Sequence, residues 1–452
     1  MKFIFYDAEA TGPEPRHDQM LHIAAVLADQ ELNECDCFVM RCRLLPHRLP
    51  APVALILTAR SMPDITDQAL PSHYEMVSAL RERLLAWSPA VFAGYSCLEF
   101  DEPLLAGAFR TCLFPPHLMQ EGGNSRLDVQ RLALALHSFE KGALTFVLRH
   151  DGQPSFRLSE VARANGIAHD NAHDALGDVR TTLELARLMA QRAPWLWEHM
   201  IAMGQAAQAI RFAHAAPVRL YTEFHHNRPH HWLVTALTDV PDASGELPAF
   251  DLAIDPVQGR GLDDDALRRW LLRHPKPIRP IKLAECPFVL PRERAKGVGL
   301  ADGAEQDRRA AVLAQDHPYR QRLLAAHAAL QQKPEREDDS AIGAVFHHKS
   351  WAERAAMSRD LPEGPLRRRA ERLFFDERPD LLETPARIHL EAEQAAAMLK
   401  EQKVPWRTLS EAFDLTDAAF EHATAADTDR LEGLLAYLRA ELAWAKRAVD
   451  GA

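Results

Sequence analysis

The sequence predicts an α/β fold in its first part, followed by a β-rich part and an α-helical part. Three observations support this prediction. Short apolar runs alternate with amphipathic helical patterns over residues 1–193, strand-like pieces separated by Pro, Asn and Gly occupy residues 218–255, and a nearly continuous helical pattern covers residues 351–448. The chain has 452 residues, of which 47% are hydrophobic, so it can bury several cores. We expect domains at 1–193, 194–340 and 346–452.

The composition argues against several classes of protein. The first residues lack an apolar run followed by a small-residue cleavage site, and no later window is apolar enough to span a bilayer. We therefore expect a cytoplasmic protein that does not associate with a membrane. The spacing of the six cysteines provides no second Cys-x2-Cys motif to complete a zinc site. We therefore expect the cysteines to be reduced thiols. The net charge of −11 argues against coating nucleic acid by bulk electrostatics but permits binding through a local groove.

The first apolar run, at residues 3–6, predicts a buried strand with two carboxylates after it. Asp7 and Glu9 share one face because strand side chains alternate with a period of two. Neighbouring carboxylates repel each other, so a fold that brings them together supplies a cation, and hard oxygen ligands suit magnesium or manganese. An exposed polar strand end is the alternative interpretation.

A third candidate ligand follows a second buried strand. Residues 22–28 and 37–43 are expected to continue the sheet, residues 74–87 to form a helix, and residues 90–95 to return to the sheet. Asp101 then lies in the first turn of a helix and points toward the strand ends. Its alternative role is that of an aspartate favoured by the helix dipole.

A histidine and an aspartate five residues apart complete the set of candidates. An amphipathic helix is expected to begin near Asp174, because apolar residues recur from there at three- and four-residue steps. His173 would then lie on the approach loop and Asp178 on an early helical turn. A fixed carboxylate can hold a metal ion, and a histidine can take a proton at neutral pH. A solvated histidine beside a capping aspartate is the alternative.

Taken in order, these signals resemble a known group of nucleases. The motifs Asp7-x-Glu9-x-Thr11-Gly12, Phe100-Asp101 and His173-x4-Asp178 resemble those of the DEDDh 3′-to-5′ exonucleases. The segments PSFRL (154–158), ANGI (164–167), NAHDALGD (171–178) and GGNSRLD (122–128) are similar to the bacterial exodeoxyribonuclease I family. The similarity is much weaker beyond residue 195.

The resemblance implies a fold and an activity. The fold is an RNase-H-like exonuclease domain with a central mixed sheet, then an SH3-like domain and an α-helical C-terminal domain. The activity is hydrolysis of single-stranded DNA from its 3′ end to nucleoside 5′-monophosphates, in DNA repair and recombination. Two Mg²⁺ ions, replaceable by Mn²⁺, are implied as cofactors. The implied partners are single-stranded DNA and the C-terminal tail of single-stranded DNA-binding protein, with the enzyme a monomer.

The resemblance also assigns roles to particular residues. Metal ligands are expected at Asp7, Glu9, Asp101 and Asp178, a general base at His173, and substrate contacts at Glu9 and Arg157. Two features depart from the family pattern: Thr11 stands where the family tends to have an aromatic residue, and Ser96 and Cys97 stand where it has asparagines. The second departure leaves the hydrogen bonding near Asp101 open.

Two rival functions remain on the sequence alone. A DEDDh exoribonuclease would carry the same catalytic signature, because the choice of DNA over RNA depends on contacts to the 2′-hydroxyl. The two additional domains favour DNA. A non-catalytic clamp for single-stranded nucleic acid could use the same fold, but all five catalytic positions carry competent residues.

Overall fold

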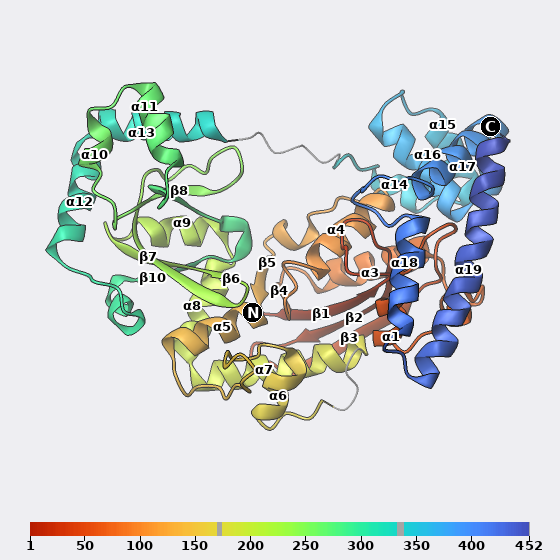
Figure 1. Ribbon diagram of the computed structural model, residues 1–452, viewed down its shortest axis with the longest axis horizontal. Helices are drawn as coiled ribbons and strands as arrows, with labels where there is room; N and C mark the ends of the chain where they lie inside the picture. The colour runs from red at the N-terminus through yellow and green to blue at the C-terminus, as the bar shows by residue number, and fades with distance from the viewer. Residues whose placement is uncertain (170–173, 332–338, 452) are drawn as a thin grey trace. The chain divides into compact units, whose positions relative to one another are not determined.

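The structure is a computed structural model that describes residues 1–169, 174–331 and 339–451 (Figure 1). The chain forms two compact units. One comprises residues 1–124, 169–183 and 338–452, and the other comprises residues 125–168 and 184–337. The division into domains at 1–193, 194–340 and 346–452 stays a prediction, because the compact units follow a different grouping of the chain.

The first unit is built on a mixed sheet. The strands of this sheet that belong to the first unit, in the order β3-β2-β1-β4, are β1 (Phe3–Ala10), β2 (Met20–Ala28), β3 (Glu34–Arg41) and β4 (Val91–Gly94). β1 pairs antiparallel with β2 and parallel with β4, which confirms the predicted mixed sheet. The segment Phe3–Tyr6 is buried throughout, as expected for a central strand covered on both faces.

The position of the first two carboxylates differs from the prediction. Asp7 and Glu9 were expected after the strand, but β1 continues to Ala10, because β2 pairs with it as far as Met20. Both carboxylates therefore lie inside the hydrogen-bonded ladder, which restricts their backbone more tightly than a loop would.

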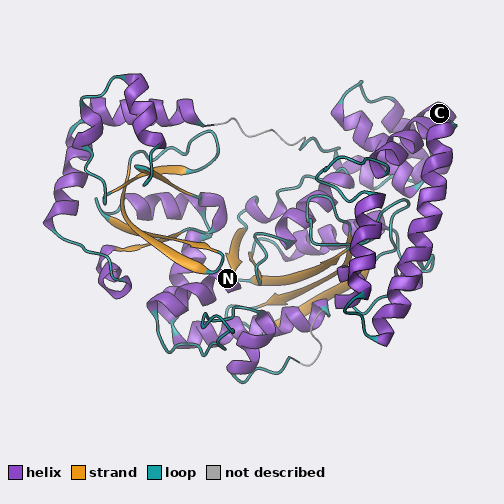
Figure 2. Cartoon of the chain, in the orientation of Figure 1, coloured by secondary structure: helices purple, strands orange, loops and turns teal. Residues whose placement is uncertain are grey.

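Helices from both ends of the chain cover this sheet (Figure 2). Those from the first half are α1 (Pro52–Leu57), α2 (Met62–Thr66), α3 (His73–Trp87), α4 (Asp101–Thr111), the 3₁₀ turn η1 (Leu118–Gln120) and the start of α7 (Ala175–Arg192). Those from the C-terminal part are α14 (Ala344–His347), α15 (Trp351–Arg359), α16 (Pro365–Glu377), η4 (Pro379–Leu381), α17 (Thr384–Met398), α18 (Leu409–Phe420) and α19 (Ala425–Asp450). The sequence explains where α3 begins, since Ser72 and Glu75 form a reciprocal capping box.

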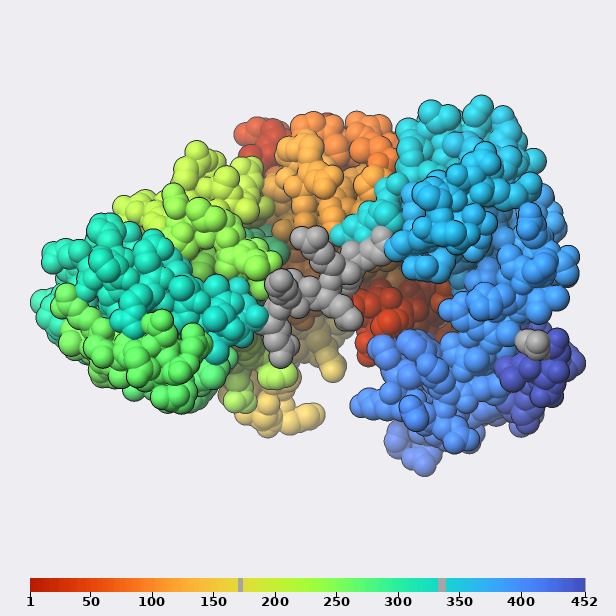
Figure 3. Space-filling view, turned by 90° about the horizontal axis from the view of Figure 1, so that it is seen from above, coloured from red at the N-terminus to blue at the C-terminus, as the bar shows by residue number. Residues whose placement is uncertain are grey.

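The C-terminal helices share a hydrophobic core with the N-terminal part of the chain. Leu49 and Leu55 pack in one buried cluster with Met398, Leu409 and Leu438. In Figure 3 the blue surface of the C-terminal helices accordingly borders the red surface of the N-terminal residues. The prediction of a helical C-terminal part is therefore confirmed. Its helices help to bury the segment of the chain that follows β3.

The second unit contains an antiparallel sheet. Its strands, in the order β10-β6-β7-β8-β9, are β6 (Arg219–His225), β7 (Arg228–Ala236), β8 (Leu247–Asp251), β9 (Ile278–Ile281) and β10 (Phe288–Pro291). The unit also contains β5 (Ser125–Asp128) and the helices α5 (Val129–Phe139), α6 (Leu158–Ala164), α8 (Pro194–Met203), α9 (Ala206–His214), α10 (Val257–Arg260), α11 (Asp264–Leu272), α12 (Ala304–Gln315) and α13 (His317–Leu330), with the 3₁₀ turns η2 (Leu283–Glu285) and η3 (Arg292–Val298). The predicted β-rich middle part is confirmed.

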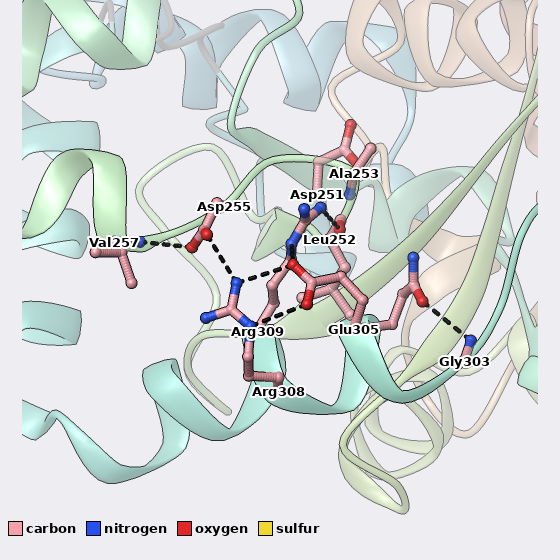
Figure 4. Close-up of polar contacts among 10 residues, drawn as sticks. Asp251, Leu252, Ala253, Asp255, Val257, Gly303, Glu305, Arg308 and Arg309 are labelled. Atoms are coloured by element: carbon pink, nitrogen blue, oxygen red, sulfur yellow. Dashed lines mark hydrogen bonds and ion pairs between the residues drawn. The ribbon is translucent and has the colours of Figure 1, made fainter.

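A polar network fixes α12 to the segment after β8 (Figure 4). Arg308 donates to Asp255 at 2.7 Å and to Glu305 at 2.9 Å, and Arg309 donates to the Leu252 carbonyl at 2.8 Å. Asp255 also accepts a hydrogen bond of 3.0 Å from the Val257 amide, so this carboxylate joins α12 to the start of α10. Across the described parts of the chain, every helix is too short or too polar to cross a lipid bilayer.

Candidate metal and catalytic site

Strand β1 places two carboxylates on one face of the first unit. Asp7 and Glu9 are half-buried, whereas the alternate residues Ala8 and Ala10 are buried in the core, as the two-residue period of a strand requires. The pairing of β1 with β2 shifts register between Glu9 and Ala10. Such bulges redirect side chains near functional sites, and this one lies beside Glu9.

Helix α7 supplies a third carboxylate. Ala175, Val179 and Leu183 are buried and anchor its first turns. Asp178 lies beside them on an early turn, and its oxygen lies within 4.8 Å of ligand oxygens of both Asp7 and Glu9. The structure thus brings Asp178 beside Asp7 and Glu9, which precede it in the sequence by about 170 residues.

Asp101 lies next to this group but faces the backbone of β1. It is 4% exposed, at the first position of α4, and its Oδ1 accepts a hydrogen bond of 2.9 Å from the Ala8 amide. It is not one of the three residues whose oxygens lie within 4.8 Å of one another. Its charge nevertheless acts on both Asp7 and Glu9.

The clustered carboxylates disfavour each other's ionised forms. Burial, followed by the charge of Asp101, raises the pKa of Asp7 well above its usual value. Burial and the charge of Asp178 raise the pKa of Glu9 to about 8. A site whose carboxylates resist ionisation in this way is stabilised by a cation, because the positive charge restores the ionised form.

The chemistry of the donor set fits a divalent metal ion. Asp7, Glu9 and Asp178 offer carboxylate oxygens, which are the hard ligands that Mg²⁺ and Mn²⁺ prefer. Among the described residues, this trio is the one group of at least three such side chains close enough to hold an ion. The arrangement also places the ligands on a strand and a helix, elements that hold geometry more firmly than loops.

The predicted general base, His173, lies outside the described residues. A different histidine contacts the carboxylate site: Nε2 of His169 lies 2.5 Å from Oδ1 of Asp178, and its side chain is 4% exposed. The contact joins the third carboxylate of the site to a buried imidazole. Sequence reasoning missed His169, although it stands four residues before His173 in the segment AHDNAHD.

Arg157, the predicted substrate contact, belongs to the second unit. It stands at the N-cap of α6, its side chain is 82% exposed, and its Nη1 lies 3.9 Å from Glu160. An ion pair with an exposed arginine and a separation of 3.9 Å contributes little to stability. The guanidinium is therefore available to another anion.

The loop after β1 is held in place by a residue near the C-terminus. Asp18 accepts hydrogen bonds from the Thr11 hydroxyl at 2.8 Å and from the Glu14 amide at 2.9 Å. Arg407 donates to the same carboxylate at 2.9 Å. A Cβ atom on Gly12 would lie 2.6 Å from Oδ2 of Asp18 and closer still to Nη2 of Arg407, so a larger residue here would displace this ion pair.

The two positions that depart from the family pattern differ in their environments. Ser96 has a φ of 60°, in the left-handed region that asparagine adopts more readily than serine. Cys97 is 1% exposed and packs in the core beside Gly94. The departure at Ser96 therefore has a conformational cost, whereas Cys97 acts as a small apolar residue.

Comparison with known proteins finds sequence similarity in the first part of the chain. Residues 4–186 match the RNase_T family model, described as exonuclease. Exodeoxyribonuclease I of Escherichia coli is 30% identical over 203 residues, which cover 44% of this chain and 42% of that protein. Exodeoxyribonuclease I of Haemophilus influenzae is 28% identical over 199 residues, with 44% and 42% covered. The aligned region thus spans less than half the length of these curated relatives.

Similarity of fold extends over almost the whole chain. A moderately thermophilic exonuclease I from Methylocaldum szegediense superposes with a TM-score of 0.81 at 21% identity, covering 98% of this chain and 99% of that one. E. coli exonuclease I in complex with a dT13 oligonucleotide gives a TM-score of 0.75 at 20% identity, with 97% and 99% covered. A zinc-bound form of the E. coli protein with single-stranded DNA gives 0.76.

Proposed function

We propose that this protein hydrolyses single-stranded DNA from the 3′ end to nucleoside 5′-monophosphates, because residues 4–186 match the RNase_T exonuclease family model. The observation that carries the proposal is the convergence of Asp7, Glu9 and Asp178 within 4.8 Å. The fold shared with exonuclease I over nearly the full length supports it.

The proposed cofactors are two Mg²⁺ ions, for which Mn²⁺ can substitute. Asp7, Glu9, Asp101 and Asp178 are the residues that would hold them. When bound, such ions neutralise charge on the phosphate, activate a water and stabilise the departing 3′ oxygen. The raised pKa values of Asp7 and Glu9 support this assignment, because they report carboxylate charge without a compensating cation.

The remaining steps fall to other residues of the chain. We assign to His173 the removal of the proton from the attacking water, a step that suits an imidazole whose pKa lies near neutrality. We assign to His169 the orientation of Asp178, on the basis of their 2.5 Å contact. Glu9 and Arg157 would contact the DNA, and the exposed guanidinium of Arg157 suits a phosphate.

The biological setting is also part of the proposal. We place the protein in the cytoplasm as a monomer that acts in DNA repair and recombination. Its partners would be single-stranded DNA and the C-terminal tail of single-stranded DNA-binding protein. The single-stranded DNA in the complexes of the E. coli protein supports the first of these partners.

The test is digestion of matched substrates labelled at the 5′ end. Single-stranded DNA, duplex DNA and RNA of one sequence are incubated with the full-length protein in Mg²⁺ or in EDTA. We expect a ladder that shortens from the 3′ end only with single-stranded DNA and Mg²⁺. Faster digestion of RNA would favour an exoribonuclease, and binding without cleavage in Mg²⁺ would favour a nucleic-acid clamp.

A further inference from the structure

A cavity of the first unit has the size of a small-molecule site. Its volume is about 410 Å³, within the range of about 300–1,000 Å³ that is usual for pockets that hold small ligands. The loop after β1 lines it together with residues of α4, α16 and α17, so both ends of the chain contribute to it. None of Asp7, Glu9 and Asp178 lines it. The cavity is therefore distinct from the carboxylate cluster.

Two arginines that line this cavity share one buried carboxylate. Nη2 of Arg48 lies 3.5 Å from Oδ2 of Asp376, and Nε of Arg372 lies 3.2 Å from Oδ1 of the same residue. The side chain of Asp376 is 1% exposed, whereas both arginine side chains are partly exposed and line the cavity. One negative charge thus serves two positive charges.

The hydrogen-bonding groups of these arginines are incompletely used. The Nε atom of Arg48 is buried and has no hydrogen-bond partner in the described part of the chain. Arg372 donates from Nη2 to Oε1 of Gln394 at 2.6 Å. Buried guanidinium donors without a partner call for water or an anion, and an anion also supplies the missing charge.

The electrostatics of Arg48 also favour an anion. Burial lowers the pKa of Arg48, the charge of Asp376 raises it, and the charge of Arg372 lowers it, so the two cations repel each other. Asp18 is a further acid that acts on Arg48, but it already pairs with Arg407 at 2.9 Å. A bound anion would relieve the repulsion, and the planar forks of two arginines match the oxygens of a phosphate.

Aromatic and apolar side chains line other parts of the cavity. His17 and Trp406 both line it, and their ring centroids lie 6.4 Å apart at an interplanar angle of 61°. Nε1 of Trp406 donates to the Ala397 carbonyl at 3.1 Å, which fixes the indole ring. Aromatic rings of this kind stack on nucleic-acid bases without regard to sequence. The cavity therefore combines groups that recognise both ends of a nucleotide.

We propose that this cavity binds a nucleoside 5′-monophosphate, with its phosphate at Arg48 and Arg372 and its base beside Trp406. The phosphate supplies the negative charge that the two arginines lack, and the base covers the indole. The binding requires neither a metal ion nor cleavage, so the inference goes beyond the proposed function and does not rest on it. Under the proposed function, the ligand of this second site is the product of the reaction.

The experiment measures binding of dTMP to the full-length protein by equilibrium dialysis in EDTA. EDTA removes divalent metal from the carboxylate cluster and prevents metal-dependent cleavage, so the result is independent of the digestion test. We expect one dTMP to bind per chain, with inorganic phosphate and thymidine each binding at least about tenfold more weakly, because each lacks half of the contacts. No saturable binding of dTMP would overturn the inference. Equal affinity for inorganic phosphate would overturn the assignment of a nucleotide.

Variants locate the bound nucleotide in the cavity. Arg372→Ala and Arg48→Ala should each weaken dTMP binding by about 10–100-fold, the worth of a charge-assisted contact. Arg48→Lys keeps the charge without the planar fork, so its affinity should be intermediate. Trp406→Leu should weaken the binding of dTMP and leave that of inorganic phosphate unchanged, which separates the base from the phosphate.

The matched control is Arg367→Ala. Arg367 stands on α16 like Arg372, but it pairs with Glu371 at 3.1 Å and does not line the cavity, so its removal should leave dTMP binding unchanged. Melting temperatures identify any variant that fails to fold, and if Arg48→Ala does so, Arg48→Lys and Trp406→Leu decide the question. Unchanged dTMP binding in folded Arg372→Ala and Trp406→Leu would overturn the inference, because the nucleotide would then bind elsewhere.

Discussion

Two groups of charges lie a few residues apart in the first unit: a buried pair of opposite sign and a cluster of carboxylates of one sign. Asp18 and Arg407 are 5% and 9% exposed at their side chains, pair at 2.9 Å, and satisfy further hydrogen-bonding groups of the loop after β1. Asp7, Glu9 and Asp178 converge with charges of one sign. In the paired group each charge compensates the other, and losing one would leave a buried charge alone. In the carboxylate cluster the like charges have a stability cost that a bound cation offsets.

The largest expected effect comes from removing one charge of the carboxylate cluster. Asp7→Asn keeps the shape of the side chain but lowers its ability to hold a metal ion, so we expect the rate of cleavage to fall by about 10³-fold or more. The free energy of unfolding in EDTA should not fall, because a repulsive charge has been removed. Asp36→Asn, an exposed change of the same type, is the matched control. Parental cleavage by Asp7→Asn would contradict the metal assignment.

Removing one charge of the paired group should act on stability. Arg407→Ala leaves Asp18 buried without its cation, so we expect the free energy of unfolding, measured in urea, to fall by about 3–5 kcal/mol. The control is Arg378→Ala, whose partner Asp380 lies at a similar distance but at the surface, and its loss should stay below about 1 kcal/mol. Equal losses in both variants would show that burial of the Asp18 pair does not matter.

The pH dependence of stability should distinguish the two groups further. The folded-state pKa of Glu9, about 8, lies above its ordinary value of 4.5. Between these values the folded protein holds a proton that the unfolded chain has released, so stability in EDTA should fall as pH rises from about 5 to 8. Each such proton contributes a slope of at most about 1.4 kcal/mol per pH unit.

A divalent cation should remove this decline, because it binds the ionised carboxylates. Thermal unfolding followed across this pH range, with EDTA and with Mg²⁺, measures both slopes. Asp7→Asn should flatten the slope in EDTA, since it relieves part of the repulsion that raises the pKa of Glu9. A flat profile for the wild type in EDTA would refute the carboxylate repulsion.

The smallest expected effect comes from the turn before Asp101. Ser96 has a φ of 60°, and asparagine is enriched several-fold in that conformation. Ser96→Asn should therefore raise the free energy of unfolding by about 1 kcal/mol, measured as an increase in melting temperature. A lower melting temperature would mean that the serine side chain contributes more than the backbone preference.

Several properties of the site follow from the sequence alone because they depend on local periodicity. The two-residue period of a strand places Asp7 and Glu9 on one face, and the apolar repeat of α7 places Asp178 on an early turn. The residue types also indicate that these carboxylates repel each other and therefore need a cation. The fold class could be predicted for the same reason, since each part of the chain has its own periodicity.

Other properties depend on residues that are distant in the sequence, and only the tertiary structure decides them. Asp18 and Arg407 are 389 residues apart, and nothing in either segment indicates the other. The contact of His169 with Asp178 joins a loop residue to helix α7, and Arg60 lines the same cavity as Arg41 of β3, so both depend on how separate segments pack. The physical reason is that local patterns determine which face of an element a side chain occupies, whereas packing between elements determines which charges meet there.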